Sequence, residues 1–275
     1  MESMLQRFIR YAKINTRSDL HSDTVPTTPG QLDFLRMLES ELKDLGLSQV
    51  RFNPVDAFVT ALLPSNLPAH QKAPSIGFIA HVDTADFNAE NIQPQVHADY
   101  DGQDIVLNPD LDIVMRVSEF PNLTHYVGQT LITTDGTTLL GADDKAGLVS
   151  ILEAVIHLLA HPDLPHGDIW LAFGPDEEIG KGAHRFQAQD FPADFAYTLD
   201  SGEVGKLEYE TFNAARVMLT IDGTSVHPGT AKGLMVNALA EAAKLFARLP
   251  QDQVPELTEG HEGYYMLSSQ SGNIG

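Results

Sequence analysis

The hydrophobic and polar positions of this sequence repeat with two different spacings. Apolar residues three or four positions apart predict helices over residues 3–13 and 32–45, and a longer apolar stretch predicts another over 148–159. Short apolar runs predict buried strands, at residues 58–63, 75–80, 167–173 and 195–199. Because these strands alternate with helices, we expect the chain up to residue 200 to form an α/β sheet with helices on both faces.

The middle and the end of the chain follow different patterns. Residues 85–130 mix prolines, asparagines and aspartates with short apolar runs, and predict a surface excursion that contains short strands. Residues 131–140 predict a hairpin, since Asp135-Gly136 is a favourable turn. Later we expect two strands and an apolar helix, at residues 207–212, 215–221 and 234–248. This change predicts a first domain of residues 1–209 and a smaller α+β domain of residues 210–275.

The composition of the chain argues against several classes of protein. Acidic residues number 38 against 17 lysines and arginines, which gives a net charge of −21, so the chain repels nucleic acid and anionic membranes. No run reaches the roughly 18 apolar residues that span a bilayer, and the start of the chain lacks the apolar core of a signal peptide. The absence of cysteine excludes disulfides, thiolate metal sites and a cysteine nucleophile. We therefore expect a cytoplasmic protein that binds neither nucleic acid nor membranes.

Acidic residues and one histidine gather where the predicted strands end. His81 and Asp83 follow the strand at 75–80, and because side chains alternate along an extended chain, both leave the same face. The other candidates follow later strands or precede the helix at 148–159: they are Asp143, Asp144, Glu177, Glu178 and Asp200. Ligands of open α/β sheets bind outside the carboxyl ends of the strands. We therefore expect these side chains to form one site.

The side chains in this group are suitable for metal-assisted hydrolysis. Imidazole nitrogen and carboxylate oxygen are ligands that zinc accepts, and two zinc ions can share a bridging carboxylate. A carboxylate placed like Asp83 often orients a metal-binding histidine. In an extended segment Glu177 and Glu178 point in opposite directions, so one of them can hold a metal while the other moves protons. The pattern predicts a site for two metal ions.

Each candidate also has an ordinary structural explanation. Residues 176–178, in an acidic chain, fit a solvated loop, and residues 143–144 fit the N-terminal cap of a helix. Asp200 and His227 each fit a turn. The metal site is favoured because four separate segments bring candidates to one predicted sheet edge. The sequence has no G-x-S-x-G elbow, no P-loop, no G-x-G-x-x-G after a strand and no H-E-x-x-H.

Taken together, the motifs resemble the dinuclear-zinc family of aminopeptidases, carboxypeptidases and deacetylases. They are H-x-D at residues 81–83, G-A-D-D-K-A-G at 141–147, D-E-E-x-G at 176–180 and the aspartate at 200, in that family's order and spacing. The resemblance covers essentially the whole chain. It is strongest to the tripeptide aminopeptidases, in residues 80–84, 133–147 and 212–215.

The resemblance implies a ligand set for two Zn²⁺ ions per subunit. His81 and Asp200 would bind one ion, Glu178 would bind the other, and Asp143 would bridge them, with a cis peptide bond after Asp143. The substrate implied is a short peptide, a tripeptide that loses its N-terminal residue.

The catalytic residues that the resemblance implies are Asp83, Glu177 and His227. Asp83 would hold the His81 ring, and Glu177 would be the general base. His227 resembles a lid-domain histidine that reaches the active site of a partner subunit and steadies the oxyanion. The implied architecture is an α/β catalytic domain with a mixed central sheet and flanking helices, plus part of a smaller α+β lid or dimerisation domain, in a homodimer.

The family also has a late zinc-binding histidine and a substrate-binding arginine, and the resemblance puts both after residue 275. We therefore expect a C-terminally truncated chain with weak or no activity. Two other functions stay open. One is a dipeptidase or N-acyl amino acid deacetylase with the same metals, and the other is a non-catalytic metal-binding polypeptide.

Overall fold

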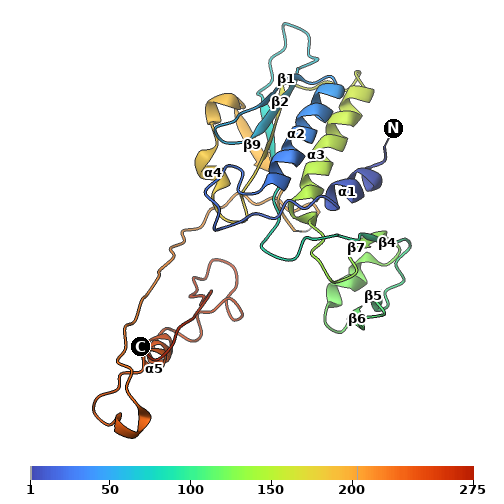
Figure 1. Ribbon diagram of the computed structural model, residues 1–275. Helices are drawn as coiled ribbons and strands as arrows, with labels where there is room; N and C mark the ends of the chain where they lie inside the picture. The colour runs from blue at the N-terminus through green and yellow to red at the C-terminus, as the bar shows by residue number, and fades with distance from the viewer. Residues whose placement is uncertain (1, 203) are drawn as a thin grey trace. The chain divides into compact units, whose positions relative to one another are not determined.

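The computed structural model describes residues 2–202 and 204–275, which form two compact units. The first unit ends at Lys206, and the second runs from Leu207 to Gly275. Figure 1 draws both units and labels many of their helices and strands. Among the described residues, none of the helices combines the length and the apolar character needed to cross a bilayer.

The main helices of the first unit lie where the apolar spacing predicts them. They are α1 (Met4–Ala12), α2 (Pro29–Asp44) and α3 (Ala142–Ala160). Helix α1 begins at a capping box, in which Ser3 Oγ accepts from the Gln6 amide at 3.3 Å and Gln6 Oε1 accepts from the Ser3 amide at 3.0 Å. Helix α2 begins with a proline, whose missing N–H costs nothing at that position. Helix α3 begins earlier than predicted, and this extension carries two of the candidate aspartates.

The centre of the first unit is a five-stranded sheet in the order β1-β2-β8-β3-β9. Its strands are β1 (Ser48–Phe52), β2 (Val59–Leu63), β3 (Ile76–His81), β8 (Ile169–Gly174) and β9 (Phe195–Thr198). Strands β8, β3 and β9 are parallel, whereas β1 pairs antiparallel with β2, and β2 antiparallel with β8. The expected α/β fold with a mixed central sheet is therefore confirmed.

Side-chain alternation along the central strands divides the core between the two faces of this sheet. Leu171 and Phe173 of β8 join the larger cluster, to which α1, α2 and α3 contribute. Trp170 and Ala172 belong to a second cluster, which also contains Phe191. The prediction of helices on both faces is thus only partly right. The connection from β8 to β9 that covers the second face has room only for the short α4 (Gly182–Arg185) and η2 (Ala188–Asp190).

The excursion between β3 and α3 contains short strands, as predicted. They are β4 (Gln95–His97), β5 (Ile105–Asn108), β6 (Ile113–Met115) and β7 (Leu131–Thr133), with the turn η1 (Pro121–Tyr126) before β7. Strands β5 and β6 pair with each other, and β4 pairs with β7. The excursion has a small core of its own, made by Tyr100, Ile105, Leu107 and Leu123.

The predicted hairpin over residues 131–140 is wrong. A turn does form at Asp135-Gly136, where Asp135 Oδ1 accepts from the Thr137 amide at 3.0 Å. However, β7 pairs with β4, which is distant in the sequence. The chain after the turn bonds elsewhere, since the Leu139 amide donates to the Asn88 carbonyl at 3.0 Å. A local turn signal therefore did not determine the pairing partner.

The second unit has less regular structure than the sequence predicts. Its elements are η3 (Pro228–Thr230), α5 (Ala238–Phe246) and an isolated bridge between Thr224 and Val236. The strands predicted at 207–212 and 215–221 do not form, although all of these residues are described. Large apolar side chains there are exposed, including Phe212 at 86% and Met218 at 88%. A strand needs a partner strand and a partly buried face. Neither is available to these two segments within residues 204–275.

We expect Leu152 of α3 to contribute strongly to stability, because its side chain is fully buried in the larger cluster. Leu152→Ala should lower the free energy of unfolding by about 2–5 kcal/mol, measured by urea denaturation. Leu159 lies on the same helix but is 39% exposed. Leu159→Ala should change the same quantity by less than about 0.5 kcal/mol, and an equal loss in both variants would contradict this core.

Candidate metal centre

Three parallel strands end at one edge of the sheet and position most of the candidate residues. Strand β3 lies between β8 and β9 and ends at His81, which is in register with Gly174 of β8. The segment after β8 carries Glu177 and Glu178, and the segment after β9 carries Asp200. His81 is therefore flanked on both sides by carboxylates from neighbouring strands.

Asp83 is fully buried and connects two parts of this edge. Its Oδ1 lies 3.3 Å from His81 Nδ1, and the same ring nitrogen lies 3.0 Å from the Asp83 carbonyl oxygen. The Asp83 carboxylate also accepts from the backbone amides of Glu177, at 2.9 Å, and Glu178, at 3.2 Å. One buried carboxylate thus orients the histidine ring and holds the acidic loop beside it.

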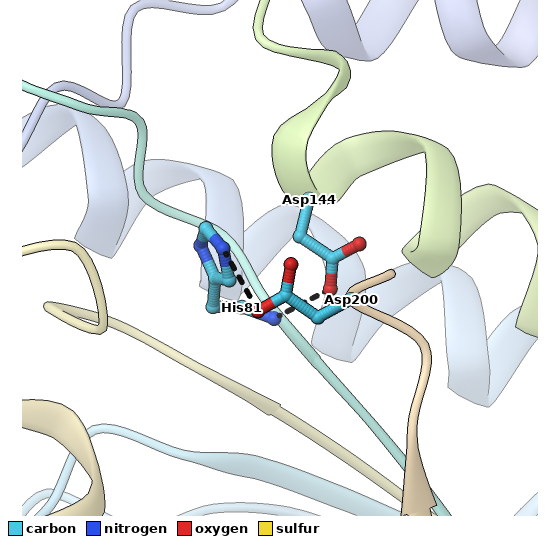
Figure 2. A group of neighbouring side chains, drawn as sticks. All are labelled: His81, Asp144 and Asp200. Carbon is cyan, nitrogen blue, oxygen red and sulfur yellow. Dashed lines mark hydrogen bonds and ion pairs between the residues drawn. The ribbon is translucent and has the colours of Figure 1, made fainter. Parts of the chain in front are cut away.

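The other ring nitrogen of His81 faces the remaining carboxylates. His81 Nε2 lies 3.0 Å from Asp143 Oδ1, 3.7 Å from Asp200 Oδ2 and 3.9 Å from Glu177 Oε2. Figure 2 shows the Asp200 side chain directed at the ring and the Asp144 side chain directed at the backbone of His81. The predicted residues of the first unit therefore come together around a single imidazole.

Asp144 is a member of this group to which the sequence assigned no role. It is 3% exposed, and its Oδ2 accepts from the His81 backbone amide at 3.2 Å. The peptide bond between Asp143 and Asp144 is cis, as the resemblance implies, and neither residue has helical backbone angles. Helical periodicity could not show which of the two aspartates is buried. The doubled aspartate was the available signal.

Gly147 allows the start of α3 to reach the end of β9. A Cβ atom at this position would collide with the Leu199 carbonyl oxygen and with Asp144 Oδ1. Only a residue without a side chain permits that approach. Gly147 therefore helps to bring the aspartates of α3 beside Asp200.

The crowding of acidic groups shifts their proton affinities. Burial by itself lowers the pKa of His81, but the hydrogen bond to Asp83 and the nearby carboxylates outweigh it and raise that pKa to about 10. Burial raises the pKa of Asp144 to about 8, an effect that His81 opposes and Asp200 reinforces. Burial also raises the pKa of the other carboxyl groups here, those of Glu177, Glu178 and Asp200. So many acidic groups around one ring concentrate negative charge, which favours a bound cation.

Two overlapping sets of side chains have the spacing of metal ligands. One is His81, Asp144 and Asp200, and the other is His81, Asp143 and Glu178. Within each set, the candidate ligand atoms lie within 4.8 Å of one another. Imidazole nitrogen with carboxylate oxygen fits a divalent cation. The first set contains Asp144, whereas the sequence grouped His81 and Asp200 with Asp143.

His227 belongs to the second unit. It is exposed, and its Nδ1 accepts from the Gly229 amide at 3.0 Å at the start of η3. This contact is the turn role that the sequence also allowed for His227.

A family comparison covers most of the motifs described above. The model of peptidase family M20/M25/M40 matches residues 131–273, which is more than half of the chain. The chain belongs to peptidase family M20/M25/M40. The matched segment includes Asp143, Glu177 and Asp200, while His81 lies before it.

Individual relatives in this family match nearly the whole chain. Peptidase T of Fusobacterium nucleatum is 56% identical over 271 residues, which are 98% of this chain and 65% of that protein. Peptidase T of Listeria monocytogenes is 52% identical over 274 residues, which are 99% of this chain and 66% of that protein. The chain thus spans about two thirds of the length of these relatives.

A solved structure agrees with the fold. The crystal structure of a tripeptidase from Staphylococcus aureus matches with a TM-score of 0.58 at 22% identity, and covers 93% of this chain and 57% of that chain. At this identity the match concerns the fold alone. It supports the mixed α/β architecture that the strand order shows.

We expect the close approach at Gly147 to hold α3 beside the end of β9. Gly147→Ala should lower the free energy of unfolding by about 1–3 kcal/mol, because the added methyl group pushes α3 away from β9. It should also weaken the binding of Co²⁺, since the aspartates of α3 move with the helix. Urea denaturation and a Co²⁺ titration measure the two effects. Gly202→Ala is the control, because a Cβ atom there meets no atom within 4 Å; similar results for both variants would disprove this role.

Proposed function

We propose that this chain carries the catalytic site of a metal-dependent aminopeptidase that releases the N-terminal residue of tripeptides. The observation that carries the proposal is the grouping of His81 with an exposed Glu177 and the metal-ligand carboxylates, in a chain 56% identical to a Peptidase T. The high identity favours a tripeptide substrate over an N-acylated amino acid. It also favours catalysis over metal binding alone.

Zinc is the metal that we propose for this site, with two ions per chain. His81, Asp144 and Asp200 would hold one ion through His81 Nε2, and the carboxylates of Asp143 and Glu178 would hold the second ion beside it. Divalent ions bound there supply Lewis acidity toward water and toward the peptide carbonyl group. Asp83 keeps the His81 ring in place through the contact at Nδ1, which leaves Nε2 directed at the carboxylates.

Glu177 is the proposed general base. Its side chain is 56% exposed, so it can contact both water and substrate, and its Oε2 lies 3.9 Å from His81 Nε2. Burial and the nearby carboxylates raise the pKa of Glu177. A glutamate with a raised pKa can take a proton from the attacking water and then donate it to the leaving amine. The Asp83 carboxylate supports this role by fixing the Glu177 backbone amide.

The second unit is proposed to belong to a lid or dimerisation domain, with residues 210–275 as its part of the chain. In a homodimer, His227 would steady the oxyanion in the active site of the partner subunit. The absence of cysteine is compatible with the cytoplasm, which we propose as the compartment.

Metal binding gives a direct test of the proposed site. Isothermal titration with Zn²⁺ should count two ions per chain. Zn²⁺ at 100 times its dissociation constant should add about 2.7 kcal/mol per independent site to the free energy of unfolding, and EDTA should reverse this effect. His81→Ala should lose the first of the two ions, because His81 Nε2 is the only nitrogen ligand that the described residues offer to the two ligand sets and it can bind one ion. His125→Ala, at an exposed position of η1, should bind as the unchanged chain does; a chain that binds no Zn²⁺ contradicts the proposal.

Hydrolysis of an unblocked tripeptide tests the role of Glu177 in a chain of the relatives' full length, of which these residues span about two thirds. Glu177→Gln should lower kcat at least about 100-fold with little change in KM, because the amide cannot accept the proton. Its zinc content should stay at the level of the unchanged chain. Release of the N-terminal amino acid, followed by chromatography, measures the rate.

Two comparisons make this measurement specific. Glu119→Gln changes an exposed glutamate of the excursion and should leave kcat unchanged. A panel of tripeptides, dipeptides and N-acetyl amino acids then tests the substrate. Faster hydrolysis of N-acetyl amino acids than of tripeptides would replace the aminopeptidase proposal with a deacetylase.

A further inference from the structure

A buried carboxylate that is not in either ligand set lies directly before Glu177. Asp176 is fully buried, and each of its carboxylate oxygens lies 3.2 Å from the Thr27 backbone amide. Its Oδ1 also accepts from the Thr27 hydroxyl and, at 2.9 Å, from Gln31 Nε2. Its Oδ2 accepts from Arg185 Nη1 at 3.1 Å. Asp176 is thus bound to the start of α2 and to α4.

The backbone of Asp176 is held as closely as its side chain. Its amide donates to Gln31 Oε1 at 3.1 Å, so Asp176 and Gln31 exchange two hydrogen bonds. Its carbonyl oxygen accepts from the amides of Lys181 and Gly182, both at 3.0 Å. Its φ of 61° lies in the left-handed region, which residues other than glycine adopt when their surroundings impose it.

The loop that carries Glu177 and Glu178 is therefore fixed from two directions. The Asp83 carboxylate binds the amides of both glutamates, and the Asp176 carboxylate ties the preceding residue to Thr27 and Gln31. Asp176 has a left-handed backbone conformation, and the next two amides, of Glu177 and Glu178, are bound to Asp83. Together these constraints determine the direction in which the two glutamate side chains leave the backbone. Loss of either attachment would leave the loop held at one end.

We infer that Asp176 is a positioning residue, which acts through Glu177 and Glu178 by holding their loop in the conformation that directs them toward His81. This inference rests on the proposed function, in which Glu178 binds metal and Glu177 is the general base, so that their orientation toward His81 matters. Asp176 itself contacts neither the His81 ring nor the other candidate ligands through any of the contacts described above. Its effect on metal binding must therefore pass through the loop.

Asp56 provides a matched control for the loss of a buried carboxylate. It is 2% exposed, and it accepts from the Phe58 amide at 2.9 Å and from the Gln187 amide at 2.8 Å. Like Asp176, it fixes loop backbone next to the sheet, but its partners lie outside residues 176–178. Asp56→Asn should therefore reproduce any general destabilisation without moving the glutamates.

Hydrogen–deuterium exchange tests the positioning role without requiring metal or activity. In Asp176→Asn, the amides of Glu177 and Glu178 should exchange at least tenfold faster than in the unchanged chain. A peptide from α3, residues 148–159, should keep its rate. In Asp56→Asn the two glutamate amides should stay within twofold of the unchanged chain. Equal exchange at these amides in both variants would overturn the inference.

Cobalt binding supplies a readout that a purely structural role would not change. Asp176→Asn should weaken the binding of Co²⁺ at least tenfold and alter its visible absorption spectrum, whereas Asp56→Asn should do neither. Thr27→Val removes the hydroxyl donor to Asp176 and should act like Asp176→Asn, while Thr27→Ser should restore the spectrum. An unchanged spectrum in Asp176→Asn would refute the positioning role. If the unchanged chain binds no Co²⁺, the proposed function fails, and the exchange measurement alone decides the role of Asp176.

Discussion

A carboxylate that is buried away from water needs hydrogen-bond donors from the protein. For Asp83, these donors belong to residues of the candidate metal centre. Its donors are two backbone amides from the segment after β8, and its Oδ1 lies beside the ring of His81, the last residue of β3. Without these donors the buried Asp83 carboxylate would lack hydrogen-bond partners, which would lower the free energy of unfolding by several kcal/mol. The arrangement of histidine and glutamates is therefore tied to the need to satisfy one buried group.

The parallel order of β8, β3 and β9 brings those parts to a common edge, and a single close contact adds the fourth segment. Parallel strands end at the same edge of the sheet, so strand pairing alone makes neighbours of the residues that follow each strand. The aspartates of α3 come from a helix, and they reach this edge because Gly147 lets the helix approach Leu199. The sheet thus positions His81, the glutamates and Asp200, and the packing of α3 positions Asp143 and Asp144.

Much of this placement could be predicted from local sequence patterns, and the failures share a physical cause. Alternation along β3 predicted that His81 and Asp83 lie together, and strand ends predicted the position of Glu177 and Asp200. Helical spacing could not distinguish Asp143 from Asp144, because neither has helical backbone angles. The turn at Asp135-Gly136 was predictable, but the pairing of β7 with β4 depends on residues far away. The strands expected at 207–221 failed for the same reason, since a strand needs a partner that local pattern cannot supply.

The attachment of Asp176 to Thr27 joins residues 149 positions apart, and it has a consequence for how the chain is made. A ribosome adds about 5–20 residues per second, so Thr27 is synthesised several seconds or more before Asp176, which accepts its hydrogen bonds. The last carboxylate of the centre, Asp200, emerges later still. Synthesis of most of the first unit is therefore finished before the candidate centre has all of its side chains.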